Sequence, residues 1–397
     1  MKVFIIAFSI FALFYGYMGW RIIIPAGYAF PWNAVLWFVF ALGMTLPFIS
    51  IFFRIYEYSP KWIYIFNWIV FFSMGFFSLV FTFIVARDIV LLFSGGVQKL
   101  YALISGFFSP GIPVDDPVNP DRHRFLAHSL NMGIVGMSGL LSGYGLYEAR
   151  KSPVVVNVDI PVHNLHADLA GFRIVQITDI HVGTTIKHNF VQTIVDKVNS
   201  LKPDVIAFTG DLADGMVANL REDVAPLAEL SARYGSYFVT GNHEYYMGVE
   251  AWIGEVDRLG FSVLLNEHRI IHHGAGSILL AGVTDYNGGN FIKSHESSPH
   301  AALEGAPPDI LKILLAHQPR SVFAASSAGY DLQISGHTHG GQYFPWNYFV
   351  HLQQPYTKGL HRHDTTWIYV SKGTGYWGPP IRIGVPSEIT VFSLTET

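Results

Sequence analysis

The chain has 397 residues, of which 50% are hydrophobic and only 14% are charged, with a formal net charge of −4. A soluble enzyme usually has about 25% charged residues, so part of this chain is expected to lie in lipid, and the length leaves room for a second module. The small net charge without a run of Lys or Arg argues against a nucleic-acid partner, and the lack of Cys excludes disulfides and thiolate metal sites.

Four long apolar runs precede residue 150, and a helix needs about 20 such residues to cross a bilayer. The runs cover residues 3–20, 34–53, 62–86 and 126–146. Arg87 and Asp88 follow the third run inside an apolar segment that continues to Phe93, so the end of that run is open. A cleaved signal peptide is the alternative for the first run, which is longer than a typical apolar core of about 7 to 15 residues and has no small-residue cleavage site. We predict a multi-span anchor over residues 1–150, in the cell membrane.

Four crossings would place the amino terminus and the chain after residue 150 on the same side of the membrane. The face with the amino terminus has the basic residues Lys2, Arg54, Lys61, Arg150 and Lys151. The opposite face has Arg21, Lys99, Arg122 and Arg124, with Arg87 near the boundary. Because basic residues are enriched on the cytoplasmic side, this small difference favours a cytoplasmic location for the carboxyl-terminal part.

From Val154 onward, short β-rich runs alternate with amphipathic helical patterns. The predicted strands are 172–178, 204–209, 236–240, 278–283, 313–316 and 332–335, and the predicted helices are 190–201 and 249–259. Alternation of this kind predicts an α/β fold, in which ligands bind beyond the carboxyl ends of the strands.

Five polar motifs directly follow predicted strands within one 165-residue stretch. They are Asp179-Ile180-His181, Gly210 to Asp214, Gly241 to Glu244, His317, and Gly336 to Gln342, which reads GHTHGGQ. Taken singly, each has a structural alternative, such as a turn, a helix cap or a structural His. Their conjunction is hard to explain by turn chemistry alone. Carboxylate, amide and imidazole donors without thiolates indicate borderline to hard divalent metals, in a number sufficient for two ions.

The five motifs resemble those of the calcineurin-like metallophosphoesterase superfamily, whose pattern D-x-H, G-D-x-x-D, G-N-H-E, H and G-H-x-H is complete here. The GHTHGGQ ending after a membrane anchor is similar to a branch found among bacterial membrane phosphoesterases. The resemblance implies a four-layer α/β sandwich over residues 155–397, with two mixed β-sheets flanked by helices, preceded by an all-α transmembrane module.

The resemblance also implies the site roles. For two divalent ions, taken from Mn, Fe or Zn, it implies one ligand set of Asp179, His181, Asp211 and His339 and a second of Asp211, Asn242, His317 and His337. Asp211 would be the bridge, His243 would face the scissile ester, and Asp214 would orient His243. Phosphate mono-, di- or pyrophosphate esters would then be hydrolysed by a metal-activated hydroxide.

Several alternatives stay open. The anchor suggests a lipid-linked substrate in contact with membrane lipid, and a lipid-precursor pyrophosphatase of the nucleotide-diphospho sugar type is the narrower reading. A non-catalytic, metal-binding regulatory membrane protein is the alternative, which the intact motifs disfavour. Lys372 and Arg382 follow a Gly-rich segment and could meet a substrate phosphate, although solvated surface charges are favoured. The aromatic residues of 343–349 could contact lipid or pack in the core.

Overall fold

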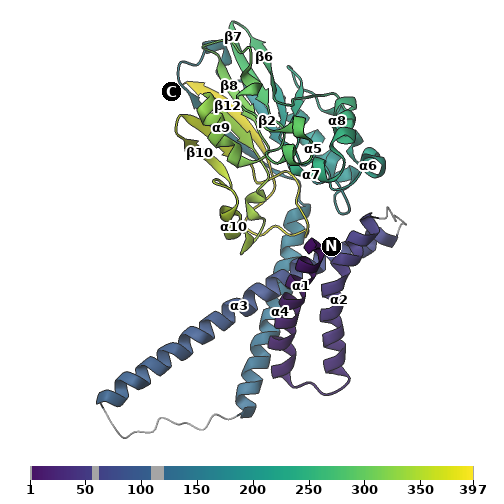
Figure 1. The fold of residues 1–397 in the computed structure, drawn as a ribbon, viewed down its shortest axis with the longest axis vertical. Helices are drawn as coiled ribbons and strands as arrows, with labels where there is room; N and C mark the ends of the chain where they lie inside the picture. The colour runs from purple at the N-terminus through teal and green to yellow at the C-terminus, as the bar shows by residue number, and fades with distance from the viewer. Residues whose placement is uncertain (1, 56–61, 109–119, 397) are drawn as a thin grey trace. The chain divides into compact units, whose positions relative to one another are not determined.

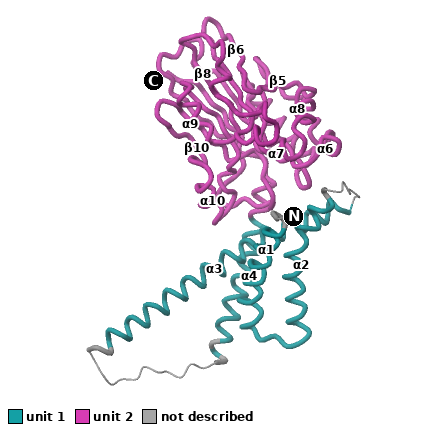
Figure 2. Tube along the Cα trace, viewed as in Figure 1, with its two compact units in different colours: residues 1–144 teal, residues 145–397 magenta. Residues whose placement is uncertain are grey.

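The computed structural model describes residues 2–55, 62–108 and 120–396 (Figure 1). It divides the chain into two compact units, Met1–Tyr144 and Gly145–Thr397, drawn in teal and magenta in Figure 2. Lys61, one of the basic residues used to predict the membrane topology, lies outside the described residues.

Four helices long and apolar enough to cross a membrane lie in the described amino-terminal part, as predicted. They are α1 (Lys2–Ala26), α2 (Trp32–Ile55), α3 (Trp62–Phe108) and α4 (Pro120–Arg150). Helix α3 continues well beyond the predicted end at residue 86 and has 47 residues. At 1.5 Å per residue it is about 70 Å long, more than twice the thickness of a hydrocarbon core of about 30 Å. Only part of α3 can therefore cross the core.

A cluster of charged and polar side chains explains why α3 does not end at its two charged residues. Asp88 accepts hydrogen bonds from Arg21 Nε at 2.6 Å and Nη2 at 2.7 Å, and Arg87 Nη2 lies 2.7 Å from it. The Tyr17 hydroxyl also donates to Asp88, and Arg87 donates to Asn131. These contacts join α1, α3 and α4, and they satisfy charges that would otherwise favour a helix end in water.

Asp88→Asn is expected to destabilise the amino-terminal unit, because it leaves two guanidinium groups without their carboxylate. Removing one partner of a buried ion pair costs about 3–5 kcal/mol, but the Arg21 and Asp88 side chains are 28% and 18% exposed, so we expect about 1–3 kcal/mol. Thermal unfolding of the full chain in detergent measures the change. Glu148→Gln is the control, since Glu148 pairs with a half-exposed Lys151. Equal midpoints for the two variants would contradict a stabilising role for the cluster.

The carboxyl-terminal unit contains two six-stranded sheets, which confirms the predicted pair of mixed sheets. The first has the order β1 (Val154–Val162), β12 (Glu388–Glu396), β2 (Arg173–Ile177), β3 (Val205–Phe208), β4 (Ser236–Phe238) and β5 (Phe261–Val263). The second has the order β10 (Gly359–His363), β11 (Thr366–Val370), β9 (Leu332–Ser335), β8 (Leu311–Leu315), β7 (Gly276–Gly282) and β6 (Glu267–His273). Strands β2 to β5 are parallel, as are β7, β8, β9 and β11, so their carboxyl ends lie at one edge of each sheet.

The two sheets pack face to face between two layers of helices, which confirms the four-layer sandwich. Successive residues of β2 point to opposite faces: Ile174 packs between the sheets, and Val175 packs against the outer helices. Those helices are α5 (His188–Ser200), α6 (Val217–Val224) and α8 (Val249–Arg258) (Figure 1). On the outer face of the second sheet, α9 (Val322–Ala328) contributes Ala325 to a separate cluster. This packing brings the carboxyl ends of both sheets together.

Candidate metal centre

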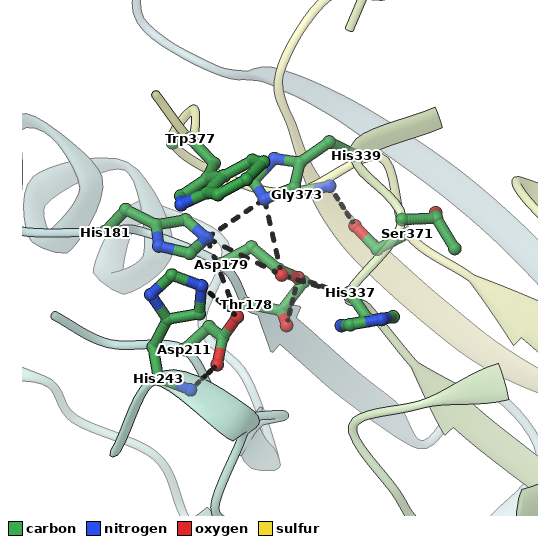
Figure 3. A network of polar contacts seen from close by, with 12 residues as sticks. Thr178, Asp179, His181, Asp211, His243, His337, His339, Ser371, Gly373 and Trp377 are labelled. Carbon is green, nitrogen blue, oxygen red and sulfur yellow. Dashed lines mark hydrogen bonds and ion pairs between the residues drawn. The ribbon is translucent and has the colours of Figure 1, made fainter. Parts of the chain in front are cut away.

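The predicted ligands lie on loops at the carboxyl ends of strands from both sheets. Asp179 and His181 follow β2, Asp211 follows β3, Asn242 and His243 begin α7 (Asn242–Tyr246) after β4, His317 follows β8, and His337 and His339 follow β9. Figure 3 shows the labelled side chains of this set pointing toward one another.

Backbone conformation singles out the same positions. Five of the seven predicted metal ligands have positive φ, namely Asp179 (53°), His181 (56°), Asp211 (54°), His337 (73°) and His339 (50°). Non-Gly residues rarely adopt this left-handed region, because the backbone conformation is strained there. Such a conformation persists where the surrounding structure fixes it, often at functional sites. The loops are therefore shaped to aim these side chains.

A first group of donor atoms comes from Asp179, His181 and His339. Asp179 Oδ1 lies 3.5 Å from His339 Nε2 and 3.9 Å from His181 Nε2, and the two Nε2 atoms are 3.0 Å apart. Asp179 is held in place by His337 N, which donates to its Oδ2 at 2.9 Å. The three side chains are buried and could hold one cation.

A second group surrounds His317. Its Nε2 lies 3.3 Å from Asp211 Oδ2, 3.1 Å from His337 Nδ1 and 3.2 Å from Asn242 Oδ1. Asp211 Oδ2 also lies 3.7 Å from His181 Nε2, so one oxygen faces both groups. The other oxygen, Oδ1, accepts a hydrogen bond from His243 N at 2.9 Å. The structure thus brings all seven predicted ligands together, with Asp211 between the two groups.

Two of the imidazoles form contacts through the ring nitrogen that faces away from the donor groups, as expected of metal ligands. His317 Nδ1 donates to the carbonyl oxygen of Thr209 at 2.7 Å, and His181 Nδ1 lies 2.9 Å from Asp214 Oδ1. A ring that donates from Nδ1 keeps the Nε2 lone pair available for a cation. Burial lowers the pKa of His337 to about 3, so that ring is neutral at physiological pH, as a metal ligand must be. The donor set fits borderline divalent ions.

His243 lies beside this centre and pairs with Asp214. Asp214 Oδ1 is 2.6 Å from His243 Nδ1, which makes an ion pair although the angle is not that of a hydrogen bond. His243 Nε2 is 3.9 Å from Asp211 Oδ2. Burial lowers the pKa of His243, but the carboxylates of Asp211 and Asp214 outweigh it and raise the pKa to about 9. Burial would raise the pKa of Asp214, yet His181 and His243 hold it well below its usual range. Protein charges thus favour a protonated His243 beside an ionised Asp214.

Comparison with known proteins decides the family. The calcineurin-like phosphoesterase family profile matches residues 172–341, which contain every predicted site residue. An uncharacterized metallophosphoesterase of Helicobacter pylori is 38% identical, over 69% of this chain and 72% of its own length. The chain belongs to the calcineurin-like phosphoesterase family.

Two further similarities concern the membrane part and the fold. A bovine transmembrane protein with metallophosphoesterase domain is 41% identical over 282 residues, 68% of this chain and 63% of the relative, so this chain spans less than two thirds of that relative. This name and the four long apolar helices support membrane association. The solved NAD nucleotidase of Haemophilus influenzae has a TM-score of 0.37 at 17% identity, covering 51% of each chain.

Glu244 has a structural role that the sequence did not reveal. Its fully buried carboxylate accepts hydrogen bonds from Asp211 N (3.0 Å), Leu212 N (2.8 Å) and Gly241 N (2.7 Å). Burial raises the pKa of Glu244 to about 7, and Asp211 adds to the effect. The loop after β3 is thereby tied to the loop after β4. The sequence does show a carboxylate in the third motif. It does not show the role of this carboxylate, because its partners are backbone groups and not residues of a motif.

Glu244→Gln should lower the free energy of unfolding, because a side-chain amide cannot accept all three hydrogen bonds and its NH₂ group would face a backbone donor. A buried donor left unsatisfied costs about 1–3 kcal/mol. Denaturant unfolding of the full chain in detergent measures this cost. Glu250→Gln on α8 is the matched control, since Glu250 is exposed and surface changes are usually within about 0.5 kcal/mol. Equal stability of the two variants would show that the three hydrogen bonds contribute nothing.

The expectation that Arg382 is a solvated surface charge was wrong. Its side chain is fully buried, its guanidinium donates to the carbonyls of Val385 at 3.0 Å and Lys372 at 2.8 Å, and its Nη2 lies 3.2 Å from His339 Nδ1. Burial lowers the pKa of Arg382 to about 10, so it stays charged. Lys372 is 2.8 Å from the buried Glu388 and is not a free surface charge either. Arg382 supports the loop behind a predicted ligand.

Aromatic side chains border the open side of the centre. The Trp377 ring lies 5.9 Å from the His243 ring, and the Tyr246 ring lies 5.3 Å from it, both with large exposed areas. Trp377 is fixed by the last residue of the GHTHGGQ motif: its N–H donates to Gln342 Oε1 at 2.8 Å, and its carbonyl accepts from Gln342 Nε2 at 2.8 Å. Trp377 is among the residues labelled in Figure 3. Sequence reasoning missed Trp377, which lies 35 residues after Gln342, the last residue of the GHTHGGQ motif.

Proposed function

We propose that this phosphoesterase hydrolyses phosphate esters with two divalent metal ions bound where the two sheets meet. The observation that carries the proposal is the position of Asp211 Oδ2, which lies 3.7 Å from His181 Nε2 in one donor group and 3.3 Å from His317 Nε2 in the other. A carboxylate oxygen shared in this way suits a bridge between two cations. Asp179 and His339 would complete one site, and Asn242 and His337 the other.

The chain's own residues supply the remaining chemistry. When bound, the two ions would lower the pKa of a water molecule and polarise the phosphoryl oxygens. His243 is held beside the centre by Asp214 and, when protonated, can donate its proton to the departing oxygen of the ester. General acid catalysis of this kind typically contributes about 10²- to 10⁴-fold. Asp214 stabilises the charged ring and orients it.

The aromatic side chains of Trp377 and Tyr246 at the border of the centre support a substrate with an apolar part. Together with the membrane helices, they favour a lipid-linked phosphate ester as the substrate. We place the carboxyl-terminal unit in the cytoplasm, on the small excess of basic residues described above. The chain lacks Cys, so a single Glu250→Cys substitution tests this placement with a membrane-impermeant maleimide. Labelling of intact cells would contradict a cytoplasmic location.

Reconstitution of the purified full chain tests the activity. The protein in detergent is stripped with a chelator and reloaded with Mn²⁺, Fe²⁺ or Zn²⁺, and its metal content is measured. A panel of an aryl monoester, an aryl diester and a diphosphate-linked lipid is then assayed. We expect hydrolysis that disappears on chelation and returns with two equivalents of metal. Hydrolysis unaffected by chelation, or none on the whole panel at full metal occupancy, would contradict the proposal.

A further inference from the structure

The segment after the GHTHGGQ motif presents a dense group of exposed apolar side chains. Tyr343 is buried, but exposure of the large apolar residues that follow ranges from 44% at Trp346 to 81% at Leu352. The group, called here the aromatic patch, consists of Phe344, Trp346, Tyr348, Phe349 and Leu352. Phe344 precedes α10 (Trp346–Phe349), and the other four members lie in α10 and the short turn Val350–Leu352, neither of which has a buried residue. Single exposed apolar residues are common, but a contiguous group marks an interaction surface.

A positively charged hollow adjoins the aromatic patch. It has a volume of about 300 Å³, and Leu352, Phe323 and Arg320 are among the residues that line it. The Arg320 guanidinium lies over the Tyr286 ring at 5.2 Å, its Nη2 donates to the carbonyl of Gln353, and its Nε is buried without a hydrogen-bond partner among the described residues. No Asp or Glu is among the lining residues. The hollow therefore offers an unneutralised cation next to apolar side chains, which suits an anionic group attached to an apolar chain.

The aromatic patch directly follows, and packs against, the loop that contains two predicted ligands. Gly341, two residues after His339, has φ +77°, and a Cβ atom there would overlap with Cα of Asn347 in α10. Asn347 N also donates to the carbonyl of Tyr343 at 3.3 Å. Only Gly allows this approach, because a side chain at that position would displace α10. The patch is thus part of the same rigid turn as the metal-binding residues.

We propose that the aromatic patch and the Arg320 hollow form a docking surface for a bilayer that contains anionic phospholipid. The aromatic side chains would enter the interface between head groups and acyl chains, and Arg320 would bind a lipid phosphate. Lipid is the occupant within reach, because α4 ends at Arg150 and β1 begins at Val154, which keeps this unit close to a membrane. Aromatic residues mixed with a basic residue are also typical of membrane interfaces.

The absence of Cys permits a direct test in the full chain. Tyr348→Cys, in the patch, and Glu250→Cys, on the exposed face of α8, are each labelled with an environment-sensitive fluorophore. The proteins are placed in nanodiscs of phosphatidylcholine with or without phosphatidylglycerol, in which some lipids carry a spin label on the acyl chain. We expect quenching at position 348 but not at position 250, and stronger quenching with phosphatidylglycerol. Leu352→Cys repeats the measurement if Tyr348→Cys does not fold.

Two further outcomes decide the identity of the occupant. Arg320→Gln should reduce the gain from phosphatidylglycerol by about fivefold, the contribution of one basic residue near an anionic surface. Quenching at position 348 no greater than at position 250 would overturn the proposal. A signal from position 348 that changes only when a disc holds two copies, without lipid quenching, would also overturn it and assign the patch to a second copy of the chain. None of these measurements requires hydrolysis, so failure of the proposed activity leaves them unaffected.

Discussion

Asp211→Asn should lose bound metal and hydrolysis together. The substitution replaces the one oxygen that faces both donor groups with a neutral amide atom, while the neighbouring imidazoles stay in place. Without a charged bridge, two cations close together would repel each other with little compensation. We expect the rate to fall by about 10³-fold or more, comparable to or larger than the loss of a single electrostatic contact to a transition state. Metal content by mass spectrometry and turnover of an aryl ester measure the two effects on one sample.

The matched control is Asp257→Asn, which removes an exposed carboxylate of α8 and should change neither quantity. Thermal unfolding of both variants separates loss of metal from loss of fold. An Asp211→Asn protein that keeps both metal equivalents and hydrolyses the ester at the normal rate would show that Asp211 is not the bridge.

His243→Asn should slow hydrolysis by about 10²- to 10⁴-fold while metal content stays near normal. The reason is that His243 lies at the edge of the centre, 3.9 Å from Asp211 Oδ2, and pairs with Asp214 instead. If His243 donates a proton to the departing oxygen, the loss should be large for an alkyl ester, whose leaving group is basic. It should be small for a p-nitrophenyl ester, whose leaving group needs no proton.

Comparison of the two esters separates this role from others. An equal loss for both esters would indicate that His243 stabilises charge on the phosphoryl group and does not protonate the leaving oxygen. Loss of metal together with activity would make His243 a ligand, since its ring also lies near His181 and Asp211. Asp214→Asn should give the same dependence on the leaving group with a smaller loss, because Asp214 acts through His243. Asp214 Oδ1 also lies 2.9 Å from Nδ1 of the predicted ligand His181, so metal content is measured on the same sample.

The convergence of the candidate site residues could be predicted from the sequence because these residues follow strands with clear apolar patterns. Strands β2, β3, β4, β7, β8 and β9 and helices α5 and α8 lie close to their predicted ranges. Parallel strands place their carboxyl ends at one edge, so the motifs could be expected to meet. The division into two sheets came from the family resemblance, since local periodicity does not tell which strands pair.

The features that were missed depend on contacts between distant parts of the chain. Strand β1 pairs with β12 through partners such as Val154 and Glu388. A local sequence pattern does not indicate a pairing between segments so far apart in the chain. Arg382 stands in a stretch rich in Pro and Gly, where a basic residue is usually exposed, and only the packing of the loop around it makes it buried. The two charges in α3 suggested a helix end because Arg21, which pairs with Asp88, and Asn131, which accepts from Arg87, belong to other helices.

The three backbone hydrogen bonds of Glu244 bear on how the proposed centre would acquire its ions. Because this carboxylate ties the loops after β3 and β4 together through protein groups, the order of Asp211 and Asn242 does not rest on metal ligation alone. Small metal domains that fold only around their ion spend binding energy on ordering the chain, whereas a scaffold ordered in advance leaves that energy for affinity. Exchange of one ion for another would then require no refolding. The choice among Mn, Fe and Zn would fall mainly to their relative supply in the cell.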